Sequence, residues 1–130
     1  MTRSRARYKS LTLLGIGVIL GVAIWTCSPW VTGTIEPWDA NTSIWPLSWL
    51  LLAVIGGLLG HPRGMYLPLG YALGQILITT RLVLTGEFGA LGWAFIAGYA
   101  MAAVIVTLAV LGLMALLRRI LRAETGPAGS

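Results

Sequence analysis

Acidic residues, cysteine and histidine are all scarce in this sequence. Its 130 residues include four aspartates and glutamates, one cysteine and one histidine. A single cysteine, Cys27, cannot form a disulfide within the chain, and a single histidine, His61, cannot form the paired-histidine haem sites or the usual zinc clusters. The sequence therefore predicts no internal disulfide, no metal site and no cofactor.

The residue sets that enzymes use for catalysis are also missing. The chain has no Ser/His/Asp arrangement, no glycine loop that follows a strand to hold a phosphate, and no HExxH or CxxC spacing. His61 and Arg63 share a short turn, where a histidine at a helix end is a simpler interpretation than a catalytic one. We therefore expect that this protein is not an enzyme.

The balance of charged and apolar residues indicates a membrane protein. Charged residues make up 10% of the chain and hydrophobic residues 57%, whereas soluble proteins contain about 25% charged residues. Four apolar runs have lengths that suit a hydrocarbon core of about 30 Å, and they cover residues 11–28, 44–60, 66–84 and 91–117. The sequence predicts an all-α integral membrane protein with four transmembrane helices in a single domain, residues 1–130.

Basic residues predict the orientation of these spans. Seven of the nine basic residues flank apolar runs in two clusters, which are Arg3, Arg5, Arg7 and Lys9, then Arg118, Arg119 and Arg122. This placement is typical of anchors beside anionic headgroups, so we expect no nucleic-acid binding. The leader 1–10, the turn at Arg63 and the tail 123–130 fall on one side, and the acidic loops 29–43 and 85–89 fall on the other. We predict two hairpins with both termini cytoplasmic, in the inner (plasma) membrane of a bacterial cell.

The first apolar run has a second interpretation, because a basic leader followed by an apolar stretch also has the outline of a signal peptide. Cleavage before Cys27 would need small residues just ahead of it, and Trp25 and Thr26 stand there instead. We therefore retain this run as the first helix. Four tryptophans follow around the loop 29–43 and predict an interfacial aromatic belt; they are Trp30, Trp38, Trp45 and Trp49.

Glycines recur at four-residue spacing in three of the four runs, and an Ala/Gly/Ala series recurs at the same spacing in the fourth. Small residues four apart allow helix backbones to approach closely inside a bilayer. The spacing therefore predicts a tight bundle. The helix-packing residues predicted on this basis are Gly17, Gly21, Gly56, Gly60, Gly70, Gly74 and Gly98.

Polar residues inside the apolar runs are the only candidates for a functional site. Gln75 and Arg81 lie in the third run, which places glycines and polar residues on one side and large apolar residues on the other. Glu36, Asp39 and Glu87 of the two acidic loops were expected on the same side of the membrane as Arg81. Such a cluster would form either a structural clasp between loops or the mouth of a polar path past Gln75.

Two functions are compatible with these patterns. The first, which we prefer, is a non-catalytic accessory or assembly subunit of a larger membrane complex, whose partners are the lipid bilayer and other membrane-protein subunits. The alternative is a small homo-oligomeric transporter or channel with a polar path near Gln75 and Arg81. An antiporter driven by an acid in the first span is not favoured, because residues 11–28 contain no acidic residue. The first, second and fourth runs are almost wholly apolar at their centres, which favours the accessory subunit.

Overall fold

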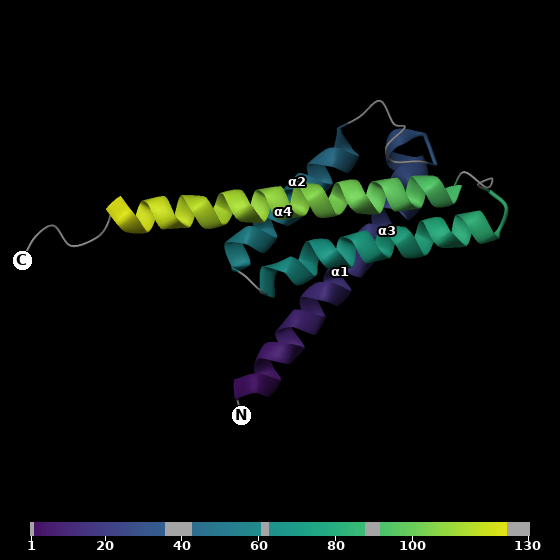
Figure 1. The fold of residues 1–130 in the computed structure, drawn as a ribbon. Coiled ribbons are helices and arrows are strands. Elements are labelled where there is room, and N and C mark those ends of the chain that lie inside the picture. The colour runs from purple at the N-terminus through teal and green to yellow at the C-terminus, as the bar shows by residue number, and fades with distance from the viewer. Residues whose placement is uncertain (1, 36–42, 61–62, 88–91, 125–130) are drawn as a thin grey trace, which may run out of the picture.

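The protein is all-helical throughout the part of the chain that its structure describes. This computed structural model describes residues 2–35, 43–60, 63–87 and 92–124. These residues form four α-helices and one short 3-10 helix, η1 (Arg63–Met65). The α-helices are α1 (Thr2–Thr32), α2 (Ile44–Leu59), α3 (Tyr66–Leu84) and α4 (Gly92–Glu124) (Figure 1).

The helix bounds differ from the predicted spans mainly at α1 and α4. α1 continues past Ser28 through Pro29 to Thr32, so the segment predicted as an outer loop from residue 29 begins four residues later, at Gly33. Gly33 has a φ of +75°, a backbone conformation that glycine adopts freely and that ends an α-helix. α4 extends beyond residue 117 to Glu124, because arginine favours helix and no glycine or proline interrupts the basic cluster.

Within the described residues, three segments are long and apolar enough to cross a membrane, namely Tyr8–Thr32, Arg63–Leu84 and Val104–Arg122. These spans indicate a membrane protein. α2 is equally apolar but has only 16 residues, which corresponds to a length of about 24 Å. A bilayer of about 30 Å would have to thin locally for α2 to cross it.

The largest helix–helix interface joins α1 and α3, which cross obliquely (Figure 1). Their backbones meet at glycines, since a Cβ atom added at Gly17 would lie 2.9 Å from Gly70 Cα. One added at Gly21 would lie 3.1 Å from Gly74 Cα. Both separations are shorter than an ordinary van der Waals contact. Because the opposing atoms belong to the backbone, no side-chain rotation can make room for a methyl group here.

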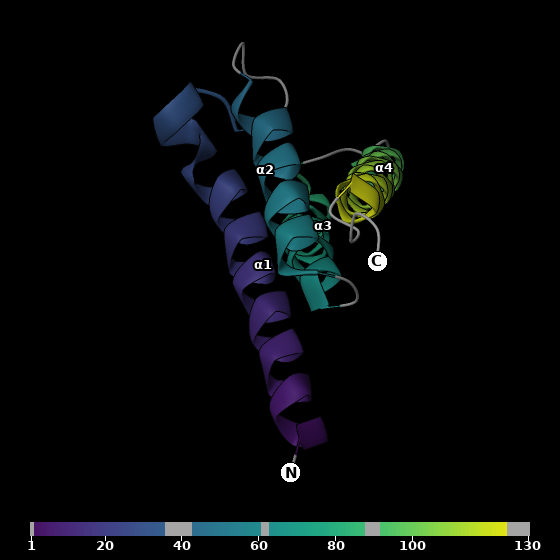
Figure 2. The ribbon, with the colours of Figure 1, turned by 90° about the vertical axis from the view of Figure 1, so that its left-hand side faces the viewer.

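Helices that follow one another in the chain are not always the main packing partners. α1 and α2 have no substantial contact, whereas α2 packs on α4 and on η1, and α3 contacts both α2 and α4. Gly56 of α2 lies against the backbone of Gly64 in η1, and Gly57 lies against the side chain of Met114. Figure 2 shows α1 and α2 rising side by side in projection while α4 is seen almost end on.

α4 is the least embedded helix. No atom lies within 4 Å of a Cβ built at Gly98 or Gly112, so Gly98, predicted as a packing residue, contacts no other helix in the described part of the chain. The C-terminal half of α4 extends beyond the other helices (Figure 1). Packing is therefore closest between α1 and α3, whereas α4 contacts α2 and α3 along one side and leaves Gly98 and Gly112 in open space.

Candidate functional site

Gln75 is the centre of a polar cluster that joins three helices. Its side chain is only 7% exposed, and its Oε1 atom accepts a hydrogen bond of 2.9 Å from Trp45 Nε1 of α2. Trp25 Nε1 of α1 donates to the same oxygen over 3.4 Å. Because two indole N–H groups approach one atom, that atom must be the amide oxygen. Gln75 therefore connects α1, α2 and α3.

A second hydrogen-bonded group lies one helical turn away, at Tyr71. This side chain is 1% exposed and its hydroxyl pairs with Ser48 Oγ of α2. Ser48 Oγ itself donates to Trp45 O over 2.6 Å, so the Tyr71 hydroxyl is the donor in the first pair. The ring of Trp49 meets the Tyr71 ring edge-on, with centroids 4.7 Å apart, an arrangement that aromatic rings prefer.

Two of the four tryptophans predicted as an interfacial belt pack inside the protein. Trp49 is buried and Trp45 is half-buried, and both belong to or pack against the apolar core. Trp30 is exposed, as a belt residue would be, and Trp38 lies outside the described residues. Burial of Trp45 follows from its hydrogen bond to Gln75, because the indole N–H finds an internal acceptor and no longer needs the interface.

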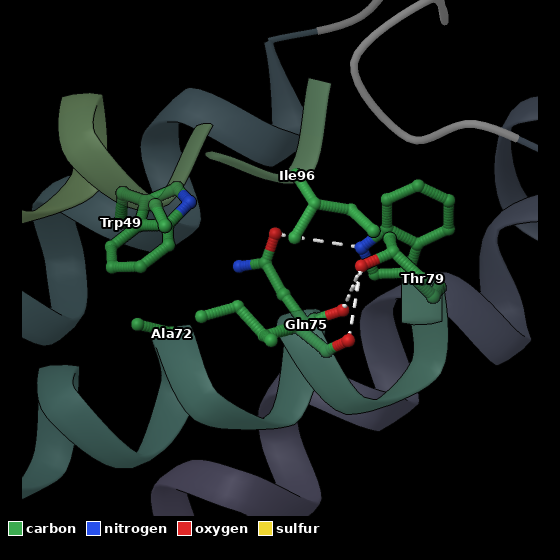
Figure 3. A pocket seen from close by; sticks show the side chains of 8 residues that line it. Trp49, Ala72, Gln75, Thr79 and Ile96 are labelled. Carbon is green, nitrogen blue, oxygen red and sulfur yellow. Dashed lines mark hydrogen bonds between the residues drawn. The ribbon is translucent and has the colours of Figure 1, made fainter. Parts of the chain in front are cut away.

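Beside Gln75 lies a cavity of about 20 Å³ between α1, α2, α3 and α4 (Figure 3). Two buried donors near it, Gln75 Nε2 and Trp49 Nε1, have no hydrogen-bond partner within the described residues. In Figure 3 the amide nitrogen of Gln75 lies on the side of Trp49, away from the bond that its oxygen accepts. The volume is sufficient for about one water molecule. At this size the cavity is too small to be an open passage past Gln75.

Thr79 completes the polar side of α3 without reaching another helix. Its hydroxyl donates to Gln75 O over 2.7 Å and to Ile76 O over 3.2 Å. Threonine commonly satisfies its hydroxyl in this way inside apolar helices. The hydroxyl proton is therefore used within α3, and the hydroxyl oxygen of this cavity-lining residue can act there only as an acceptor.

The outer charged cluster is not assembled in the described part of the chain. Arg81 is exposed and forms no ion pair with Glu87, whose Oε1 instead accepts a hydrogen bond of 3.2 Å from Thr85 Oγ1. Glu36 and Asp39, the other predicted members, lie outside the described residues. Among the residues that are described, no three histidine, cysteine or acidic side chains come together as a metal site would require.

Arg118 has a structural role that sequence reasoning missed. Its Nη2 atom donates to Gly57 O and, over 3.1 Å, to Leu58 O. These carbonyls belong to the last turn of α2, where carbonyls outnumber the backbone donors; Gly57 O also accepts a hydrogen bond of 3.2 Å from Gly60 N. A cation at this end also interacts favourably with the helix dipole. From the sequence, Arg118, Arg119 and Arg122 are interpreted as equivalent anchors. Their positions along the chain do not show which of them contacts α2.

The packing of Trp25 against α3 is not predicted in the sequence analysis, although the spacing of residues in α1 indicates it. Trp25 follows Gly17 and Gly21 at the same four-residue spacing, so the three residues share one helix face. That face meets α3, and Trp25 is 3% exposed.

Comparison with known proteins gives no relative for this chain: no family model, no curated protein and no solved structure matches it. Function must be argued from the helices and the polar cluster themselves.

Proposed function

We propose that this protein is a non-catalytic accessory or assembly subunit of a larger membrane complex, and that α4 is the helix that contacts its partner. The observation that supports the proposal is that the apolar spans differ in the share of their residues buried within the chain. In the most apolar window of the span Arg63–Leu84, 39% of the residues are buried within the chain, and in that of Tyr8–Thr32 the share is 17%, whereas in that of Val104–Arg122 of α4 none is buried. Glycine contacts join α1 to α3 and α2 to η1, and Gln75 joins α1, α2 and α3. α4 packs on α2 and α3 along one side only, and its apolar span remains open to a partner.

The proposed topology has four spans in two hairpins, with both termini in the cytoplasm of a bacterial cell and the chain in its inner membrane. Basic clusters at both ends and acidic loops between support this orientation. The arrangement of helix ends in Figure 1 is compatible with it, since the N-terminal end of α1 and the C-terminal end of α4 lie towards the left. The C-terminal ends of α1 and α3 lie towards the right.

Gly98→Leu tests the docking role of α4. A Cβ at Gly98 has open space around it, so the larger side chain should leave the chain folded and should obstruct only a partner helix. Gly15→Leu on α1 is the matched control, because that position also has no neighbour within 4 Å. We expect gentle extraction from native membranes to recover a larger assembly with wild type and Gly15→Leu, and a smaller one with Gly98→Leu. A wild-type protein that travels alone would overturn the proposal.

A homo-oligomeric transporter or channel remains the second candidate. The supporting observation is the pair of unpartnered donors, Gln75 Nε2 and Trp49 Nε1, beside a small cavity. For such a path, Gln75→Leu or Arg81→Gln should change flux through liposomes that contain the purified protein while leaving assembly intact. Unchanged flux in both variants would remove the basis for this candidate.

A further inference from the structure

A groove runs along α4 where this helix meets α2 and η1. Its volume is about 290 Å³, and its lining includes Gly57, Met65, Leu108, Leu111, Met114 and Arg118. A second cavity of about 80 Å³ shares Met65 and Leu108 with it and continues towards Trp49 and Ala72. The two spaces therefore follow one side of α4, and the groove is apolar along its length except at Arg118.

The length of the groove along α4 matches the thickness of one membrane leaflet. Leu108 and Arg118 mark its extent along α4, and ten residues of helix rise by about 15 Å. A hydrocarbon core of about 30 Å gives about 15 Å to each leaflet. Because Arg118 begins the C-terminal basic cluster, its end of the groove falls at the headgroup level and Leu108 falls near the midplane. A single acyl chain that enters from the headgroups matches this extent.

The polar end of the groove favours an anion. Arg118 uses Nη2 for the two carbonyls at the end of α2, and its Nε and Nη1 donate no hydrogen bond to any residue that the structure describes. Arg119 is adjacent and exposed, and no acidic residue lines the groove. Guanidinium groups with free donors bind phosphate oxygens strongly, and the positive charge of Arg118 disfavours a headgroup that carries an ammonium.

We propose that the groove between α2, η1 and α4 binds one anionic phospholipid. The acyl chain lies along Leu108, Leu111 and Met114, and the phosphate is held by the free donors of Arg118. A bound lipid would fill the space that this chain leaves beneath α4 and would fasten α4 to the other helices. This site is independent of any protein partner, so it is tested on the purified chain alone.

The test is lipid retention by the full chain, purified from nanodiscs that contain equal amounts of phosphatidylglycerol and phosphatidylethanolamine. Native mass spectrometry should detect one bound phosphatidylglycerol per chain and little phosphatidylethanolamine. Arg118→Gln should lower phosphatidylglycerol retention by about tenfold, because a charge-assisted hydrogen bond is lost. Arg119→Gln removes the same charge from a residue that does not line the groove, and it should retain the lipid.

A second variant keeps Arg118 in place, in case its loss also disturbs the end of α2. Gly112 lines the groove and has no neighbour within 4 Å of a built Cβ, so Gly112→Leu should occupy the space of the acyl chain and reduce retention. Gly15→Leu, outside the groove, should not. Equal retention of the two lipids by wild type, equal loss in Arg118→Gln and Arg119→Gln, or undiminished retention in Gly112→Leu would overturn the proposal.

Discussion

One added methyl group at Gly74 provides a direct test of the α1–α3 packing. A Cβ built there would lie 3.0 Å from the backbone atoms Val22 N and Val18 C, and closer still to Val18 O. These atoms are part of helix α1, so the whole helix would have to move away. Forcing extra volume into a close-packed contact costs about 1–3 kcal/mol. We expect Gly74→Ala to lower the free energy of unfolding by that amount.

The matched control is the same substitution where space is available. Gly15 lies on α1 with no atom within 4 Å of a built Cβ, so Gly15→Ala should stabilise the helix by about 0.5–1 kcal/mol, the usual advantage of alanine over glycine. The two variants should therefore differ by about 1.5–4 kcal/mol. Gly98→Ala, also in open space, should behave as Gly15→Ala does.

The assay is reversible unfolding in mixed micelles with a rising fraction of denaturing detergent, followed by tryptophan fluorescence and circular dichroism. Trp25 and Trp49 are buried beside α3, so their emission should report the separation of α1 from α3. If Gly74→Ala and Gly15→Ala shift the transition equally and in the same direction, the close approach of the two backbones is not what stabilises this fold.

Three further outcomes follow from the structure. Gln75→Leu should destabilise the fold by about 1 kcal/mol in the same assay, because two indole donors lose their acceptor, and an unchanged transition would show that the interaction across three helices contributes nothing. Arg81→Gln should change stability by less than about 0.5 kcal/mol, because the side chain is exposed and unpaired with Glu87; a larger loss would reveal a partner. Single cysteines at Thr34 and Thr85, in a Cys27→Ser background, should react with an impermeant thiol reagent from outside intact cells, and protection of either one would contradict the four-span topology.

The sequence by itself determined the helices and the class of protein. Apolar runs with few charges can only be stable in lipid as helices, because every backbone group must then bond within its own segment. The bounds of α3 were predicted at residues 66–84 and observed at Tyr66–Leu84. At α1 the predicted helix end, before Pro29, is wrong, because the helix continues through this proline to Thr32 and stops at the positive φ of Gly33.

Only the tertiary structure decided which faces meet. Glycine pairs at the same spacing occur in α1 and α3, and this spacing carries no information about the partner. The third predicted pair extends past the end of α2, because Gly60 caps that helix with a φ of +85° and does not pack against another helix backbone. In the fold, the pairs of α1 and α3 contact each other, whereas Gly56 of α2 contacts η1. Which helices pack together also decides which atom accepts the hydrogen bonds of Trp25 and Trp45, and which carbonyls Arg118 binds. A helix face is a local property of the chain, but contacts 50 or 61 residues apart in sequence exist only after the helices have packed.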